Sequence, residues 1–203
     1  AKTLRKLGFQ PLVGPRGPRA RYRGQILGCD FSCVKRVSQQ VEVLLYIGTG
    51  RFHPLGAALA THRPVYIANP LTGELSQTGG LRDFIHERKT TISRAAGATR
   101  IGVVTSSKRG QARYALAHQL VQKLRKSGKN AELVVLDEIS PESLGDYSFE
   151  ALVCAACPRI AIDDAHRYEV PILTPFEVSV MLGEAQIENY QMDEIHPIDL
   201  RKV

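Results

Sequence analysis

The stretch ALVCAACPRIAIDD, residues 151–164, decides the interpretation of this chain. It begins with an apolar run, which is typical of a parallel strand buried on both faces. It ends with a thiol, a proline, an arginine and two carboxylates, and ligands of open α/β sheets bind just beyond the carboxyl ends of the strands. The stretch QILGCD, residues 25–30, has the same form, a short apolar strand that ends in Gly-Cys. Two cysteines at strand ends predict one shared site.

Outward from this stretch, strands and helices alternate along the chain. The apolar runs predict strands at 25–27, 41–47, 65–68, 100–104, 132–136, 151–154 and 172–173. The periodicity and the Gly and Pro positions predict helices at 34–40, 54–61, 80–96, 111–127, 141–144 and 175–182. This alternation predicts an α/β fold with two similar small domains, each a parallel sheet flanked by helices. The pattern restarts after Gly97, so we expect domains at 1–97, carrying Cys29, and 98–203, carrying Cys157.

Composition sets broad limits on the function. The chain has 27 Lys and Arg against 20 Asp and Glu, a net charge of +7, which suits a nucleic-acid or ribosome-associated partner but also many enzymes. The sequence has no apolar run of membrane-spanning length and no signal peptide, so we expect a cytoplasmic protein without a membrane partner. Residues 2–8 look like the end of a helix, which suggests a fragment or a processed chain. Residues 11–23, with three prolines and four arginines, predict a linker or surface segment, and a solvated loop is favoured over a basic patch for RNA or an acidic partner.

The four cysteines form two pairs, Cys29-x3-Cys33 and Cys154-x2-Cys157. They are compatible with a four-cysteine zinc site, with an iron–sulfur cluster held from separate segments, or with buried, inert thiols. We expect Cys33 and Cys154 to be buried and inert, because Cys154 falls within an apolar strand and Cys33 falls where a helix can begin. We expect Cys29 and Cys157 to be metal ligands, because each occupies a turn that does not need a buried hydrophobe.

Other polar residues also stand at predicted strand ends. Arg159 presents a planar fork that can grip a carboxylate, although a salt bridge with Asp163 or Asp164 is an equally good interpretation. The polar turn 106–111 precedes a helix and can offer N–H groups to an anion, or it can simply cap that helix. His53 follows a glycine-rich turn, where a structural role is the more common one. The sequence has neither a Walker A loop nor GxGxxG after a strand, so it does not predict those modes of nucleotide binding.

Three strings resemble a known family: GCD (28–30), YIGTGRFHPLG (46–56) and ACPRIAIDD (156–164). Together they are similar to the archaeal 2-(3-amino-3-carboxypropyl)histidine synthases, which catalyse the first step of diphthamide biosynthesis, and the resemblance covers nearly the whole chain. It implies three similar α/β domains around a [4Fe-4S] cluster, each supplying one cysteine. Cys29 then corresponds to the second-domain ligand and Cys157 to the third-domain ligand. The first domain and its cysteine are absent here, so we expect that domain to be cleaved, omitted or present as another chain.

The resemblance also implies a non-classical radical reaction. S-adenosyl-L-methionine binds the open iron of the cluster, its Cγ–S bond is cleaved, and the 3-amino-3-carboxypropyl group is transferred to a histidine of translation elongation factor 2. The methionine carboxylate and amine need a firm grip, for which Arg159, Gln111 and Asp163 are the candidates and Lys108 and His53 are weaker ones. The family suggests a homodimer, and no direct contact with nucleic acid is expected.

Two other functions remain open from the sequence. One is a non-catalytic paralogue whose cluster only passes electrons to a catalytic partner. The other is a zinc-stabilised RNA-binding module, for which the arginines of residues 11–23 are the specific support. Retention of Arg159 and Gln111 favours the catalytic interpretation over the paralogue, and the RNA-binding module ranks below both because those arginines are its only specific support.

Overall fold

The computed structural model describes residues 1–196, and they form two compact units, Ala1–Leu81 and a second one that begins at Arg82. The expected division after residue 97 differs from this, because helix α4 (Leu81–Ala96) packs with the second unit. Phe84 of α4 meets Tyr190 edge-to-face, with ring centroids 5.1 Å apart. Arg88, one turn later, forms a buried ion pair with Glu177. These long-range contacts decide to which unit the helix belongs.

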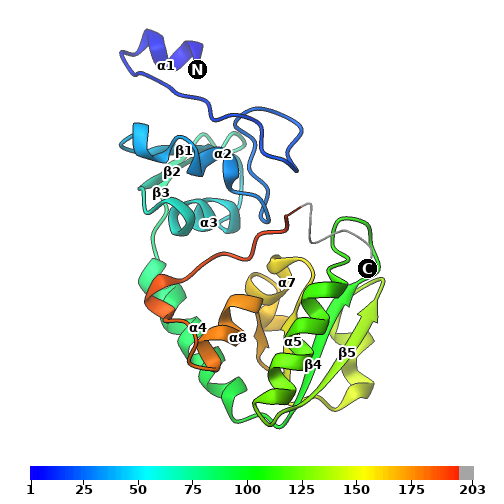
Figure 1. The fold of residues 1–203 in the computed structure, drawn as a ribbon. Helices are drawn as coiled ribbons and strands as arrows, with labels where there is room; N and C mark the ends of the chain where they lie inside the picture. Colours follow the sequence, from blue (N-terminus) through cyan, green and yellow to red (C-terminus); the bar gives the residue numbers. More distant parts are fainter. Residues whose placement is uncertain (197–203) are drawn as a thin grey trace. The chain divides into compact units, whose positions relative to one another are not determined.

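The first unit is a small three-stranded sheet with helices (Figure 1). Its elements are α1 (Lys2–Lys6), α2 (Ser32–Lys35), η1 (Ser38–Gln40), β1 (Leu44–Ile47), α3 (Phe52–Thr61), β2 (Val65–Ala68) and β3 (Leu75–Gln77). The strand order is β1-β2-β3, with β1 and β2 parallel and connected through α3. β3 is antiparallel to β2, which the alternation of strands and helices did not predict. The connection after Asn69 is a short turn with Gly73 at φ +73°, and so short a turn can only return the chain antiparallel.

The strand expected at 25–27 is wrong. Only Leu27 and Asp30 form an isolated antiparallel bridge, and the chain reverses between them. The N–H of Leu27 donates to the carbonyl of Asp30 at 3.2 Å, and the N–H of Asp30 donates to the carbonyl of Leu27 at 3.0 Å. Gly28 and Cys29 are therefore the tip of a tight turn.

The second unit contains a four-stranded sheet with the order β5-β4-β6-β7, in which all neighbours are parallel. Besides α4 its elements are β4 (Arg100–Ser106), α5 (Tyr114–Lys126), β5 (Asn130–Leu136), α6 (Pro141–Leu144), η2 (Gly145–Tyr147), β6 (Ala151–Cys154), α7 (Pro158–Ile162), η3 (Ala165–Arg167), β7 (Ile172–Leu173), α8 (Pro175–Met181) and η4 (Ile187–Asn189). The two central strands, β4 and β6, are buried almost throughout, as expected for parallel strands covered on both faces. The α/β class with parallel sheets flanked by helices is thus confirmed.

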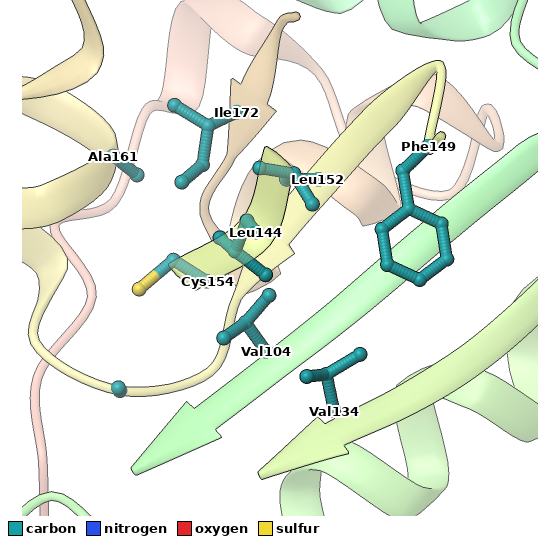
Figure 2. Packing of buried hydrophobic residues seen from close by; sticks show 9 residues of the cluster. Val104, Val134, Leu144, Phe149, Leu152, Cys154, Ala161 and Ile172 are labelled. Atoms are coloured by element: carbon teal, nitrogen blue, oxygen red, sulfur yellow. The ribbon is translucent and has the colours of Figure 1, made fainter. Parts of the chain in front are cut away.

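A hydrophobic cluster packs one face of this sheet (Figure 2). Its buried members are Val104, Val134, Leu144, Phe149, Leu152, Cys154, Ala156, Ala161 and Ile172. Leu152 and Cys154 point to this face because side chains alternate along a strand, while α5 packs on β4 and β5. Gly102 of β4 leaves room for the Phe149 ring, since a Cβ atom there would lie 2.6 Å from Cδ2 of Phe149. The cluster fixes β6, and with it the turn that follows.

Capping boxes set the beginnings of two helices in this unit. Ser140 caps α6 together with Ser143, and Thr174 caps α8 together with Glu177. A proline follows each cap at the first helical position, where its missing N–H costs nothing. Both helices begin where the prolines predict. None of the helices within residues 1–196 combines the length and the apolar character that crossing a membrane requires.

Candidate functional site

The turn after β6 carries the first candidate ligand. Cys157 is half-buried and is the N-cap residue of α7, with Pro158 at the first helical position. Burial raises the pKa of the Cys157 thiol, while the backbone N–H and the positive charge of Arg159 act in the opposite direction. The thiol is therefore protonated at neutral pH unless a cation draws off its proton, as a bound metal does.

Cys154 stands three residues earlier and faces the interior. Its side chain is fully buried within the hydrophobic cluster (Figure 2), and burial raises its pKa to about 12. Its Sγ lies 3.4 Å from the carbonyl oxygen of Cys157, to which it donates a weak hydrogen bond. The predicted burial of Cys154 is confirmed. This hydrogen bond supports the backbone of the Cys157 turn.

In the first unit, Cys29 is half-buried at the tip of the turn between Leu27 and Asp30. Gly28 lies directly against the ring of Phe52, and any Cβ atom at Gly28 would come closer to that ring than real Cβ atoms do. Asp30 anchors the other side of the turn. Burial raises the pKa of its carboxyl group, but hydrogen bonds from the Ser32 hydroxyl and from the N–H groups of Arg19 and Ser32 outweigh this and lower the pKa below its usual value.

Cys33 is buried behind this turn, as predicted, with 1 % of its surface exposed. Burial, and then the nearby charge of Asp30, raise the pKa of its thiol to about 11. Gly14 lies against the Cys33 carbonyl so closely that no side chain fits there. Residues 11–23 are thus anchored to the Cys29 turn at Gly14, while most of their side chains are exposed, as expected for a surface segment.

Arg159 and Asp163 lie one turn apart on α7. Nε of Arg159 donates to Oδ2 of Asp163 at 2.9 Å, so the salt bridge considered as an alternative is present. The pair is partly exposed, with 58 % of the Arg159 side chain accessible. Within residues 1–196 the two terminal guanidinium nitrogens form no hydrogen bond or ion pair. Asp163 therefore orients the guanidinium group of Arg159 through Nε. The two terminal nitrogens can bind an anion in this orientation.

The turn after β4 carries Lys108 and Gln111. Because β4 and β6 are neighbours in a parallel sheet, this turn and the Cys157 turn lie at the same edge. Lys108 is exposed and pairs with Glu138, whose hydrogen bond raises the pKa of the lysine. Gln111 is half-buried, and its N–H donates to the carbonyl of Lys108 at 3.0 Å. The helix begins at Tyr114, later than expected, so Gln111 lies in the turn itself.

His53 belongs to the other unit. It lies in the first turn of α3, stacked on Tyr46 with ring centroids 6.1 Å apart and an interplanar angle of 13°. Phe52 contacts the same imidazole edge-on at 5.6 Å. This aromatic packing agrees with the structural role that is the more common one for such a histidine.

The sequence interpretation missed a buried ion pair beside Cys157. Arg113 and Asp193 form a bidentate contact, with nitrogen–oxygen distances of 2.6 and 3.0 Å. The N–H of Arg113 donates to Oγ1 of Thr105, which in turn donates to the carbonyl of Ala155, between the two cysteines of the motif. The negative charge of Asp193 also contributes to the raised pKa of Cys157. Eighty positions separate the partners, and no local pattern marks either of them.

Within residues 1–196, no cluster of three or more His, Cys, Asp and Glu side chains is arranged to hold a metal ion. Each unit instead offers one half-buried cysteine at a turn and hides its second thiol. Neither pair can therefore chelate a metal by itself. A metal site that used Cys29 or Cys157 would therefore need ligands from other segments.

The chain belongs to the diphthamide synthesis family. The family model described as "Putative diphthamide synthesis protein" matches residues 1–191. The chain is 40% identical to the 2-(3-amino-3-carboxypropyl)histidine synthase of Pyrococcus horikoshii over 95% of its length, and 34% identical to that of Methanocaldococcus jannaschii over 86%. These alignments cover 54% and 50% of the two relatives, so the chain spans about half of their length.

A solved structure agrees with this assignment. The crystal structure of Dph2 from Pyrococcus horikoshii with a 4Fe-4S cluster superimposes with a TM-score of 0.86 at 38% sequence identity. The match covers 96% of this chain and 55% of that one. The expected family is confirmed.

Proposed function

We propose that this chain is part of a 2-(3-amino-3-carboxypropyl)histidine synthase, a transferase of diphthamide biosynthesis, and that Cys29 and Cys157 are ligands of a [4Fe-4S] cluster. One observation carries the proposal: each unit keeps one cysteine half-buried at a turn and buries the other. The relative that contains a 4Fe-4S cluster supports the identity of the cofactor. The remaining ligand comes from the part of the relatives' length that this chain does not match.

The residues fit a cluster better than a zinc site. A four-cysteine zinc site needs all four thiolates at about 2.3 Å from one ion. Cys154 lies inside a hydrophobic cluster and Cys33 is buried, so neither can turn outward without unpacking its surroundings. A cluster bound by single cysteines from separate segments needs only the other two.

A bound cluster would supply the electron for reductive cleavage of the Cγ–S bond of S-adenosyl-L-methionine, which would release methylthioadenosine and allow the 3-amino-3-carboxypropyl group to pass to a histidine of translation elongation factor 2. The task of the chain is to hold the methionine end of that substrate at the edge of the sheet. The terminal nitrogens of Arg159 bind the carboxylate bidentately, with Asp163 fixing the orientation of the guanidinium group. Gln111, from the adjacent turn, is placed to contact the amine or the carboxylate. Lys108 and His53 contribute less, because Lys108 pairs with Glu138 and His53 stacks on Tyr46.

The test is anaerobic analysis of iron, sulfide and zinc, followed by dithionite and S-adenosyl-L-methionine, with any preceding domain of the protein supplied. Cys29→Ala and Cys157→Ala should abolish cluster binding, whereas Cys33→Ala and Cys154→Ala should retain most of it. About four irons per protomer and methylthioadenosine as the product support the proposal. An equal loss at all four positions overturns the ligand assignment.

Other products separate the remaining functions. Deoxyadenosine in place of methylthioadenosine keeps the cluster but contradicts the cleavage of the Cγ–S bond. A reducible cluster without any cleavage indicates the electron-transfer paralogue. Zinc without iron indicates the RNA-binding module. We further propose that the protein is cytoplasmic and that it forms a homodimer. Gel filtration of the intact protein tests the homodimer.

A further inference from the structure

The net charge of the chain is confined to its first unit. Residues 1–81 contain eleven Lys and Arg against three Asp and Glu, whereas residues 82–203 contain sixteen against seventeen. The excess of +7 therefore has no counterpart in the unit that carries Arg159 and Cys157. Such segregation gives the first unit a positive field, which acts on charged partners over about a Debye length.

Part of this positive charge is carried by one loop, residues 11–23, which we term the arginine loop. It contains four arginines and no lysine. Arg16, Arg21 and Arg23 are exposed, and Tyr22 between the last two is 61 % exposed. The Arg21 guanidinium lies 5.3 Å from the centroid of the Tyr22 ring. Leu12 and Val13 add exposed apolar surface to the same loop.

Close backbone contacts hold the arginine loop in place. Gly14 lies against the carbonyl of Cys33, and a Cβ atom at Gly17 would be only 2.6 Å from Oδ2 of Asp30. Asp30 also accepts the N–H of Arg19 at 3.0 Å. Asp30 and Cys33 follow Cys29 by one and four positions, so the loop is fastened to the turn that carries the proposed ligand.

The outer part of the loop is braced as well. Oε1 of Gln25 accepts the N–H groups of Arg21 and Tyr22 at 2.8 and 3.0 Å. The N–H of Gly24 donates to the carbonyl of Gly14 at 3.0 Å, which closes the loop. The arginines and the tyrosine are thus presented from a fixed backbone, which lowers the entropy cost of binding.

We propose that the arginine loop is a docking surface for an acidic protein and that, on the function proposed above, it receives the protein substrate beside Cys29. Arginine forks match carboxylates bidentately, and Arg and Tyr are the residues that dominate protein–protein binding energy. The exposed Leu12 and Val13 fit a partly apolar protein surface, whereas a phosphate backbone offers nothing for them to contact. The field of the first unit speeds the approach of an acidic partner.

A hollow at the start of the arginine loop offers the partner a further binding surface. It measures about 540 Å³ and is lined by Arg5, Phe9, Gln10, Pro11, Leu12 and Gln40. A cation and exposed apolar atoms face the same space. We expect the hollow to bind an apolar side chain of the partner that has an acidic residue next to it.

The experiment compares the full chain with two double variants. Arg16→Gln/Arg21→Gln removes two exposed charges from the arginine loop. Arg82→Gln/Lys126→Gln removes two exposed charges from the second unit and is the matched control. Binding is measured with translation elongation factor 2, with poly-L-glutamate and with single-stranded oligouridine, at low and at physiological salt.

We expect the loop variant to bind elongation factor 2 and poly-L-glutamate roughly fivefold to tenfold more weakly at low salt, with a smaller difference at physiological salt. The control should bind as the unsubstituted chain does. If elongation factor 2 binds and the two variants behave alike, the docking surface is refuted while the proposed function stands. If elongation factor 2 does not bind but poly-L-glutamate binding depends on the loop, the docking surface stands and the proposed partner fails. Loop-dependent binding that is tighter for oligouridine than for poly-L-glutamate overturns the inference in favour of an RNA surface.

Discussion

The ring of Phe52 lies against the backbone of Gly28, so closely that no side chain can replace the glycine hydrogen. The reciprocal contact joins Phe31 to Gly56, where a Cβ atom would lie only 2.2 Å from Cζ of Phe31. Both phenylalanines are buried, with 4 % of Phe52 and none of Phe31 exposed. The turn that carries Cys29 and the helix α3 are therefore interlocked by two pairs of glycine and phenylalanine. Two of the sequence strings that mark the family form one structural unit.

Gly28→Ala should destabilise the first unit by about 1–3 kcal/mol, because the added methyl group forces the Phe52 ring or the turn to shift. Gly79→Ala is the control, since nothing lies within 4 Å of a Cβ atom there and its φ is not positive. Urea denaturation of the two variants measures the difference. Gly28→Ala/Phe52→Leu should recover part of the loss if the clash is its cause. Equal stability of the Gly28 and Gly79 variants would contradict the packing described.

Local pattern predicted much of the fold. The strands at 65–68, 151–154 and 172–173 and the helix at 141–144 have the bounds that the sequence indicates, because apolar runs and capping prolines are local signals. The bridge at Leu27 was mistaken for a strand because two apolar residues, Ile26 and Leu27, cannot reveal whether a neighbouring strand exists. The antiparallel β3 was missed because its residues are exposed and carry no apolar alternation.

The candidate site was predictable to a lesser degree. Residue type and turn position were enough to separate half-buried Cys29 and Cys157 from buried Cys33 and Cys154. The ion pairs of Arg113 and Arg88 were not predictable, since their partners are 80 and 89 positions away and only the folded chain brings them together. A single sequence holds no signal for such a pairing.

Arg88→Met should cost about 3–5 kcal/mol of unfolding free energy, because it leaves the carboxylate of Glu177 buried without its cation. Nε and one terminal nitrogen of Arg88 contact Glu177 at 2.6 and 2.7 Å, and both side chains are almost completely buried. Lys89→Met is the matched control at the next position. Its partner Glu188 lies at 2.8 Å, but both side chains are at least half exposed, so a loss of only about 0–1 kcal/mol is expected.

Chemical denaturation of both variants, with circular dichroism as the readout, measures this difference. If Arg88→Met and Lys89→Met lose similar amounts of unfolding free energy, the burial of the Arg88–Glu177 pair does not increase the cost of breaking it. The double variant Arg88→Met/Glu177→Gln should be more stable than the single variants predict together, because the uncompensated charge is then absent.

Alkaline pH should weaken the first unit through Cys33. Its pKa is about 11 in the folded chain and 9.0 as an isolated group, so the folded state holds the thiol proton more tightly. The stabilisation is present in full below about pH 9 and is lost as the pH rises from there through about 11. Between pH 8 and pH 10, the unsubstituted chain should therefore lose about 1 kcal/mol more than Cys33→Ala. Urea titrations of both proteins at the two pH values test this, and parallel pH profiles would contradict it.

Asp193→Ala should release the segment after η4 from the second unit, because Asp193 and Arg113 join that segment to the turn after β4. The substitution leaves the Arg113 cation buried without its carboxylate, at a cost of about 3–5 kcal/mol. Hydrogen exchange should then accelerate in residues 190–196 and around Ala155, which is connected to Arg113 through Thr105. Glu184→Ala, which removes the more exposed partner of Lys123, should change stability by about 0–1 kcal/mol and leave exchange at Ala155 unaltered. If Asp193→Ala destabilises the unit without changing exchange near Ala155, then the ion pair supports the core but does not brace the Cys157 turn.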